Sequence, residues 1–334
     1  MTIRYLFKCG IVMIFIQRDG SETRKLSYDN NVCLACGICA DSCPTSSLAL
    51  GDVLGIARGQ IEGNKLAIDE DTCVICGLCA SACPFGALDF EIDGESSKDL
   101  ANYPTWTHES AIDDEACEFC GRCTVACPQD AILFKRELPD RNDLLKGEIS
   151  INDEECIYCS ACAELCPADA ITVVNTPDAC SIEVDEDKCV YCGVCKRVCP
   201  QEAIKTVCVT CMHSEEIEKP KITGDIFIGS DCINCGWCKE ICPVDAAEVT
   251  KPFDGEIKTT EEECVGCGSC VDLCACNAVV LEDNVAKFNQ EYCVLCGACT
   301  KVCPQERIVV ERTDMKLTNV SSASWKATLE RLLD

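Results

Sequence analysis

The sequence predicts an α+β chain with little regular secondary structure, built as a tandem series of small repeated domains. Three observations lead to this prediction. The pattern Cys-x2-Cys-x2-Cys-x3-Cys occurs eight times and takes in 32 of the 37 cysteines. Short segments in which apolar and polar residues alternate precede many of the copies, and a second short segment follows them, as expected of strands. Aromatic residues make up only 5% of the chain, so a large apolar core is not available.

The cysteines of the eight motifs are the candidate metal ligands. Seven of the motifs are followed by proline, and the seventh copy is the exception. The motifs are Cys33, Cys36, Cys39 and Cys43; Cys73, Cys76, Cys79 and Cys83; Cys117, Cys120, Cys123 and Cys127; Cys156, Cys159, Cys162 and Cys166; Cys189, Cys192, Cys195 and Cys199; Cys232, Cys235, Cys238 and Cys242; Cys264, Cys267, Cys270 and Cys274; and Cys293, Cys296, Cys299 and Cys303.

This spacing is typical of [4Fe–4S] ligation. Three cysteines on one tight loop can bind three irons of a cubane, and two motifs can complete both cubanes by exchanging their fourth cysteines. We therefore predict tandem bacterial-type 2[4Fe–4S] ferredoxin domains, in which eight [4Fe–4S] clusters replace a core and without which the chain is largely unfolded. Disulfide scaffolds do not need such regular spacing, and structural zinc sites use cysteine pairs separated by a longer loop.

A small residue directly follows the second cysteine of every motif. Glycine there would allow the backbone to approach a cluster closely and to adopt positive φ. The fourth motif departs from this pattern with Ser160. The candidate cofactor-binding glycines are Gly37, Gly77, Gly121, Gly193, Gly236, Gly268 and Gly297.

The repeating unit reads as strand, cluster loop, short helix and strand, and two units would form one domain. We expect consecutive motifs to pair, because the gap between the last two motifs is short. A shifted pairing (second with third, fourth with fifth, sixth with seventh, first with eighth) remains open, since two other gaps are also short. The expected boundaries are an N-terminal strand or hairpin at residues 1–23, ferredoxin domains at 24–108, 109–178, 179–254 and 255–312, and a helical tail at 313–334.

Five cysteines lie outside the motif register. Cys276 could compete with Cys274 as a ligand, although Cys274 keeps the spacing. Cys208 and Cys211, with His213 nearby, could form a redox disulfide or bind another metal, but buried or unreactive thiols are the simpler interpretation. Cys9 and Cys180 are interpreted as structural. In the tail, Ser322–Leu333 has the cap and spacing of an amphipathic helix, which could serve an interaction or plain surface packing.

The charge and hydropathy pattern restrict the partners and the compartment. A formal charge of −28 disfavours binding to nucleic acid or to an anionic lipid surface. The apolar run at residues 10–16 is too short to span a bilayer and is predicted to be a strand, with Asp19-Gly20 as a turn into a second strand, Thr23–Tyr28. Met13 is an alternative start. So many clusters require a reducing, oxygen-poor interior, which favours the cytoplasm of an anaerobe.

Residues for bond-making chemistry are missing from the sequence. It contains only two histidines and neither a P-loop nor a dinucleotide-binding glycine motif after a strand. We therefore predict no catalytic residue, and one-electron transfer is the chemistry that the motifs favour.

The motifs and their flanking segments together resemble a known family. The eight motifs, Arg24–Tyr28 before the first and Tyr103–Glu109 before the third make the chain similar to the polyferredoxin subunit of archaeal formylmethanofuran dehydrogenase. The resemblance covers about residues 13–312. Ser160 and the missing proline after Cys274 depart from the repeat pattern and bear on local reduction potentials.

The resemblance implies an electron relay in methanogenesis. The family enzyme reduces CO2 at a tungsten or molybdenum pterin site and condenses the formate with methanofuran at a second metal site, both on other subunits. This chain would carry low-potential electrons to them in the cytoplasm of an anaerobic archaeon, with a heterodisulfide reductase complex or ferredoxin as donor. The alternatives are a polyferredoxin of a hydrogenase or another reductase complex, or a free-standing electron store.

Overall fold

The computed structural model describes residues 2–8, 11–101, 103–140, 147–208, 222–260 and 263–333. These residues fall into two compact units. Unit 1 consists of Met1–Glu109, Ile233–Gly236 and Val249–Asp334, and unit 2 consists of Ser110–Cys232 and Trp237–Glu248. The boundary between the units therefore passes through the sixth motif. None of the helices in the described ranges is long and apolar enough to cross a bilayer.

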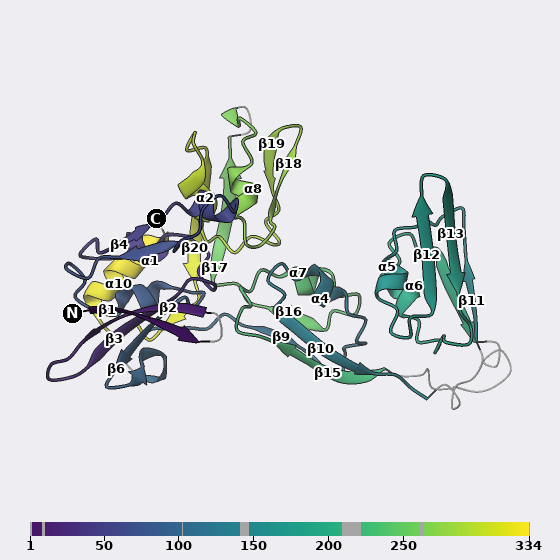
Figure 1. Ribbon diagram of the computed structural model, residues 1–334, viewed down its shortest axis with the longest axis horizontal. Coiled ribbons are helices and arrows are strands. Elements are labelled where there is room, and N and C mark those ends of the chain that lie inside the picture. Colours follow the sequence, from purple (N-terminus) through teal and green to yellow (C-terminus); the bar gives the residue numbers. More distant parts are fainter. Residues whose placement is uncertain are drawn as a thin grey trace. The chain divides into compact units, whose positions relative to one another are not determined.

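The N-terminal strands of unit 1 extend the sheet of its first domain (Figure 1). The predicted hairpin is confirmed, because β2 and β3 are antiparallel and Arg18 lies opposite Arg24 beside the turn. Ile16 and Leu26 are buried and face the core of this domain. The antiparallel sheet contains β1 (Thr2–Lys8), β2 (Ile11–Arg18), β3 (Arg24–Asp29), β6 (Leu88–Ile92) and β7 (Glu95–Ser96) in that order.

The first and second motifs form one ferredoxin-like pair within unit 1. Strands β3 and β6 pair at one side of it, β4 pairs with β5 at the other, and α1 contacts α3. The remaining elements of this pair are α1 (Ile38–Asp41), β4 (Leu48–Leu50), α2 (Val53–Ala57), β5 (Leu66–Ile68) and α3 (Leu78–Ala82).

The seventh and eighth motifs form the second pair of unit 1. Strand β17 pairs with β20 around a bulge at Asp254/Gly255, β18 and β19 form a hairpin, and α8 contacts α9. The elements are β17 (Phe253–Thr259), α8 (Ser269–Leu273), β18 (Val279–Glu282), β19 (Val285–Phe288), α9 (Ala298–Val302) and β20 (Ile308–Met315).

The segment before the third motif and the C-terminal tail join these two pairs. After the 3₁₀ turn η1 (Ser97–Asp99), strand β8 (Thr105–Trp106) pairs with β21 (Leu317–Thr318). Trp106 donates from Nε1 to the Ser81 carbonyl at 3.0 Å and contacts the Phe253 ring edge-on, with 5.4 Å between ring centroids. Trp106 thus contacts both motif pairs of unit 1.

The tail forms the predicted helix as α10 (Ala323–Leu329) followed by the 3₁₀ helix η5 (Glu330–Leu333). Ser322 caps it, since its hydroxyl accepts from the Trp325 N–H. Leu329 and Leu332 are buried in the core cluster that the two pairs share. The apolar face of the tail is therefore used for packing within this chain.

Unit 2 contains one motif pair inserted into another. The third and sixth motifs form the outer pair, in which β10 pairs with β15, β9 pairs with β16, and α4 contacts α7. Its elements are β9 (Ser110–Ile112), α4 (Arg122–Ala126), β10 (Ile132–Glu137), β15 (Thr223–Ile228), α7 (Trp237–Glu240) and β16 (Ala247–Val249).

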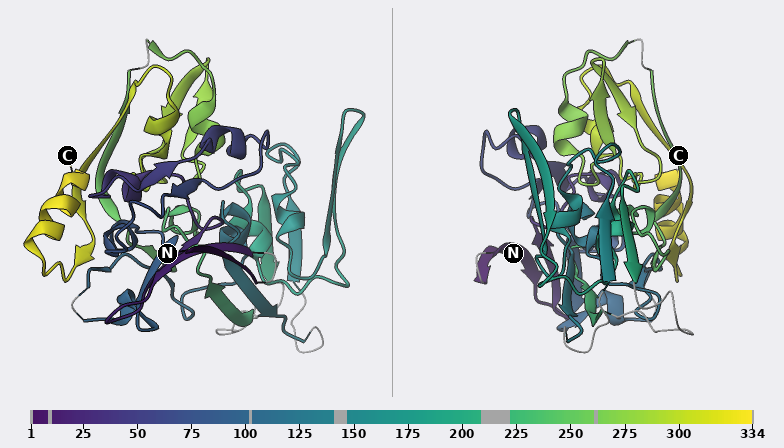
Figure 2. Two further views of the ribbon diagram at one scale, coloured as in Figure 1. Left: turned by 60° about the vertical axis from the view of Figure 1, so that its left-hand side comes forward. Right: turned by 90° about the vertical axis from the view of Figure 1, so that its right-hand side faces the viewer.

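The fourth and fifth motifs form the inner pair. Strands β12 and β13 make a long hairpin, drawn in teal in Figure 2, while β11 pairs with β14 and α5 contacts α6. Its elements are β11 (Gly147–Ile151), α5 (Ala161–Glu164), β12 (Ile171–Thr176), β13 (Ala179–Val184), α6 (Val194–Val198) and β14 (Ile204–Cys208).

This nested arrangement differs from the expected consecutive pairing. The expected domains at 109–178 and 179–254 would join the third motif to the fourth and the fifth to the sixth, whereas the strand ladders join the third to the sixth and the fourth to the fifth. The shifted alternative is right only for the fourth and fifth. The physical reason is the two-residue turn Pro177-Asp178, which closes β12 directly onto β13 and brings those two motifs together.

Candidate iron–sulfur sites

Every motif folds into the same strained loop. The residue before the second cysteine has a φ near +50° even where its side chain is bulky, as at Ile75, where φ is 49°. The residue directly after the second cysteine is also left-handed, with φ of 81° at Gly37 and 66° at Ser160. The predicted positive φ of these glycines is thereby confirmed, and Ser160 adopts the same conformation. Left-handed residues on both sides of the second cysteine turn backbone N–H groups toward one point, which suits an anionic ligand.

The cysteine sulfurs accept hydrogen bonds from these loops. The first cysteine of a motif accepts from the N–H two residues on, as in Ala35 N–H to Cys33 Sγ at 3.4 Å. The fourth accepts from the N–H four residues on, at 3.2 to 3.5 Å, in Cys43, Cys127, Cys166, Cys242, Cys274 and Cys303. Donors aimed at sulfur stabilise thiolates and lower their basicity, as iron–sulfur ligation requires.

Three cysteines of one motif and the fourth of its partner line the same cavity. In the first pair, Cys33, Cys36, Cys39 and Cys83 line a pocket whose other walls include Tyr28 and Leu66. The same three-plus-one sets occur in three further pockets. They are Cys264, Cys267, Cys270 and Cys303; Cys117, Cys120, Cys123 and Cys242; and Cys189, Cys192, Cys195 and Cys166.

Reciprocal sets are visible in the charge interactions of the thiols. Cys79 interacts with Cys73, Cys76 and Cys43, and Cys299 interacts with Cys293, Cys296 and Cys274. Six three-plus-one sets are thus brought together in the part of the chain that the structure describes. The exchange expected for 2[4Fe–4S] domains accounts for all six.

The burial of these thiols fits a cationic cofactor. Burial raises the pKa of Cys296 to about 12, and the neighbouring Cys293 and Cys274 add to the rise. The pKa of Cys195 is raised to about 12 for the same reasons, with Cys192 as the main neighbour. Thiols crowded in this way ionise readily only when a bound metal compensates the charge. No three His, Cys, Asp or Glu side chains in the described ranges form a single-ion site, and a cubane differs in that each thiolate binds a different iron.

The structure distinguishes Cys274 from Cys276. Cys274 Sγ accepts from Ala278 N–H at 3.3 Å, the bond made by the fourth cysteine in the other motifs. A hydrogen bond between the side chains of Cys276 and Cys274 lowers the pKa of Cys274 to about 6. Cys276 is only 3% exposed. Cys274 therefore occupies the place of the fourth cysteine of the other motifs, and the side chain of Cys276 hydrogen-bonds to it.

The remaining cysteines and the two histidines lie away from these pockets or outside the described residues. Cys180 is exposed on the β12–β13 hairpin, where its thiol donates to Asn175 Oδ1 at 3.6 Å. His108 packs against Trp106, and burial lowers its pKa. Cys9, Cys211, His213 and the side chain of Cys208 lie outside the described residues.

Sequence reasoning missed a set of cations that bind the cluster loops. Lys65 donates to the Cys33 carbonyl at 2.7 Å, Arg18 to that of Cys73 at 3.3 Å, and Arg197 to that of Cys192 at 2.9 Å. Lys65 and Arg18 lie outside the motifs that they contact, whereas Arg197 lies in α6, within the fifth motif itself. These three residues share no spacing from the motifs that they contact, so the sequence carries no signal that could have revealed them.

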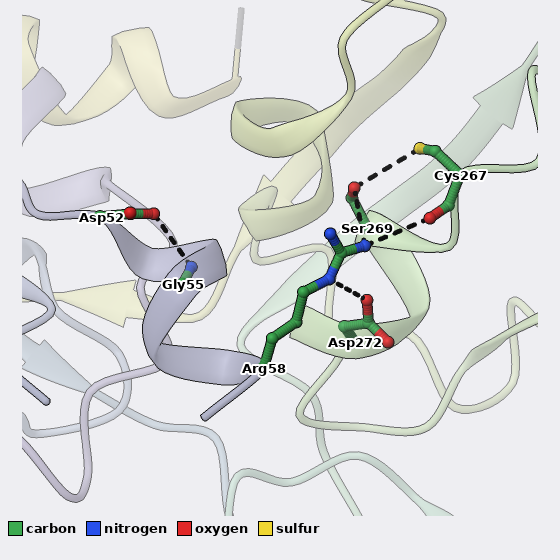
Figure 3. Close-up of polar contacts among 6 residues, drawn as sticks. All are labelled: Asp52, Gly55, Arg58, Cys267, Ser269 and Asp272. Carbon is green, nitrogen blue, oxygen red and sulfur yellow. Dashed lines mark hydrogen bonds and ion pairs between the residues drawn. The ribbon is translucent and has the colours of Figure 1, made fainter. Parts of the chain in front are cut away.

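The insertion α2 supplies another such cation within unit 1. Arg58, just after α2, donates from Nη2 to the Cys267 carbonyl at 3.2 Å and from Nε to Asp272 Oδ2 at 2.7 Å (Figure 3). Asp52 caps α2 by accepting from Gly55 N–H at 2.9 Å. The first pair thereby holds the seventh-motif loop.

The loops of the first and eighth motifs lie next to each other in unit 1. Lys301 in α9 forms a 2.8 Å ion pair with Asp41 in α1. Burial raises the pKa of Cys36 well above its usual value, and among the neighbouring thiols Cys296 of the eighth motif contributes most to the rise. Sites held by different domains are therefore close enough to interact.

Comparisons with known proteins agree with this geometry. A family model described as a 4Fe–4S dicluster domain matches residues 32–87, 116–170 and 263–307. A 4Fe–4S binding domain matches residues 182–205, and a second dicluster model matches residues 224–275. Together the matches include all eight motifs and more than half of the chain. The match at 116–170 spans two motifs that follow each other in sequence, although the strand ladders place them in different pairs.

Two relatives extend the comparison. A stretch of 135 residues is 47% identical to the polyferredoxin protein FwdF of Methanocaldococcus jannaschii and spans 40% of this chain and 38% of that protein. A chain in the formate dehydrogenase–heterodisulfide reductase–formylmethanofuran dehydrogenase complex of Methanospirillum hungatei is similar over 99% of this chain and 91% of its own length, with a TM-score of 0.61 and 26% identity. With its eight motifs, its paired cluster loops and these matches, the chain belongs to the [4Fe–4S] ferredoxin family and is a polyferredoxin.

Proposed function

We propose that this chain is the electron-transfer subunit of a formylmethanofuran dehydrogenase complex. It binds eight [4Fe–4S] clusters through the 32 motif cysteines and relays low-potential electrons toward the CO2-reducing site on other subunits. The observation that carries the proposal is the repeated three-plus-one set of cysteines, which leaves each cluster fully capped. The chemistry that such clusters supply when bound is one-electron transfer.

The partner assignment is supported by the structural similarity over nearly the full length of this chain. The similar chain belongs to a complex that contains formylmethanofuran dehydrogenase, heterodisulfide reductase and formate dehydrogenase. A heterodisulfide reductase complex is accordingly the proposed electron donor, with a free ferredoxin as the other candidate. The location that we propose is the cytoplasm of an anaerobic archaeon.

Within the chain, the protein's own residues hold and insulate the redox sites. Tyr28, Leu66 and Leu88 are almost completely buried around the first pocket, so water is kept from its sulfurs. Backbone N–H groups aimed at the cysteines favour the thiolate form. The Lys301–Asp41 ion pair holds the first and eighth motifs together, which would give electrons a connection between the two domains.

An anaerobic affinity purification of this chain from its native cells tests the proposal. We expect a molybdopterin or tungstopterin oxidoreductase subunit and an amidohydrolase-like subunit to copurify, and iron and acid-labile sulfide to be present in equal amounts at eight clusters per chain. Copurification with hydrogenase subunits would assign the relay to that enzyme. Recovery of the chain alone would indicate a free-standing electron store.

A further inference from the structure

At several motifs, the side chain at one position of the repeat donates a hydrogen bond to the cluster loop. The strand after a motif runs beside that motif's own loop, and the ninth residue after the fourth cysteine lies on it. At three motifs this residue donates to the carbonyl of the residue that precedes the second cysteine. The pairs are Arg136 to Phe119 at 3.3 Å, Asn175 to Tyr158 at 3.1 Å, and Arg312 to Leu295 at 2.8 Å.

Arg312 makes the most extensive contacts of the three. Its Nη2 donates to the Cys296 carbonyl at 2.9 Å and its Nη1 to the Leu332 carbonyl at 2.9 Å. The guanidinium also lies 4.6 Å from the centroid of the Phe253 ring. A guanidinium remains charged in proteins, so a fixed positive charge sits against the eighth-motif loop.

The eighth-motif loop receives a second cation from the same repeat position. Lys251 is the ninth residue after the fourth cysteine of the sixth motif. Its Nζ donates to the carbonyls of Glu291 at 2.6 Å and Cys293 at 3.1 Å. This loop therefore carries two cations on its backbone.

The fourth-motif loop has a neutral donor at the equivalent position. Asn175 satisfies the Tyr158 carbonyl with its amide, and its Oδ1 accepts from Cys180. The hydrogen bond to the loop is thus kept while the charge differs. Because the repeat holds the geometry constant, the charge at this position can vary independently of the loop structure.

We propose that, at the third, fourth and eighth motifs, the ninth residue after the fourth cysteine sets the reduction potential of the cluster held by its own loop. This inference rests on the proposed binding of clusters by the motifs. A cation there stabilises the more anionic reduced state and raises the potential. The clusters of the third and eighth loops therefore have higher potentials than the cluster of the fourth loop, where Asn175 brings no charge.

Three substitutions in the full-length, anaerobically prepared holoprotein test this assignment. Arg312→Gln and Arg136→Gln remove the charge and keep an amide donor, while Asn175→Arg adds a charge at the fourth loop. Lys326→Gln is the matched control, because it removes one charge from an exposed side chain of the tail helix. The readouts are iron content and a redox titration followed by electron paramagnetic resonance.

We expect one cluster to shift to lower potential in Arg312→Gln and in Arg136→Gln, one to shift to higher potential in Asn175→Arg, and none to shift in Lys326→Gln. An unchanged titration of iron-replete Asn175→Arg overturns the proposal, as does a shift in Lys326→Gln equal to that in Arg312→Gln. If Arg312→Gln loses iron, Asn175→Arg decides the question. Parent protein without clusters would instead contradict the proposed function.

Discussion

At the scale of the residue, the cluster loops contain strained backbone conformations that place their sulfurs. Ile75 is β-branched and 1% exposed, yet it has a φ of 49°. A left-handed L-residue costs about 1–2 kcal/mol, so each loop stores a cost that the folded state must offset. Sulfur–iron bonds and backbone donors to sulfur offset it in the proposed holoprotein.

Among the motif glycines, Gly77 has the least room for an added side chain. A Cβ there would lie 2.4 Å from a ring carbon of Phe90, which is completely buried. Gly94 has a similar φ of 87° but open space around it. Gly77→Ala should thus cost about 1–3 kcal/mol through overpacking, beyond the backbone strain that it shares with the control Gly94→Ala.

The measurement is the temperature at which each variant loses its iron–sulfur absorbance, in the otherwise identical full-length holoprotein. We expect Gly77→Ala to lose absorbance at a lower temperature than Gly94→Ala. Equal temperatures for the two variants would mean that Phe90 moves freely and that the loop is less tightly packed than its contacts indicate.

At this scale the sequence was a good guide to the candidate ligands and a poor guide to what surrounds them. Cysteine spacing and glycine position are local properties, and they predicted the loops. The cations were not predictable in the same way, because Arg58 and the Cys267 carbonyl are brought together only by tertiary packing.

At the scale of the element, the pairing of strands decides which motifs exchange ligands. The structure closes the fourth and fifth motifs with the β12–β13 hairpin and places Glu137 opposite Thr223 at the base of the outer pair. Gap lengths alone could not distinguish this arrangement, because the first pair encloses the insertion α2 and still pairs consecutive motifs. Short antiparallel ladders with similar sequences are compatible with more than one partner.

Deletion of the inner pair tests the nested arrangement. If residues 138–222 are replaced by a two-residue Asn-Gly turn, β10 and β15 should become a hairpin, since their ends are already opposite each other. We expect this variant to retain the iron of six clusters per chain.

The matched control removes two successive motifs instead, through deletion of residues 110–178. It should retain less iron than the first variant, because the fifth and sixth motifs lose the partners that supply their fourth cysteines. If the control retained more iron than the first variant, the motifs would pair consecutively and the nested arrangement would be wrong.

At the scale of the whole molecule, cores are small and cysteines form part of each one. The cluster of buried residues around the first pair includes Cys33, Cys39, Cys73 and Cys79, and the core of unit 2 includes Cys162 and Cys195. Apolar packing is therefore continuous with the metal sites. The formal charge of −28 adds self-repulsion that opposes a compact state.

Removal of iron should consequently unfold most of the chain. Without metal, each pocket holds four crowded thiols, and the two-stranded sheets of unit 2 are too small to be stable alone. We expect the circular dichroism of iron-free protein in reductant to lack a cooperative melt, with residual signal from the five-stranded N-terminal sheet and α10, which have more apolar support. High salt should restore little structure, because screening removes repulsion without replacing the sulfur–iron bonds. A native-like cooperative melt of the iron-free chain would contradict this, and would mean that packing of the apolar residues around the pockets is sufficient to hold the loops in their strained form.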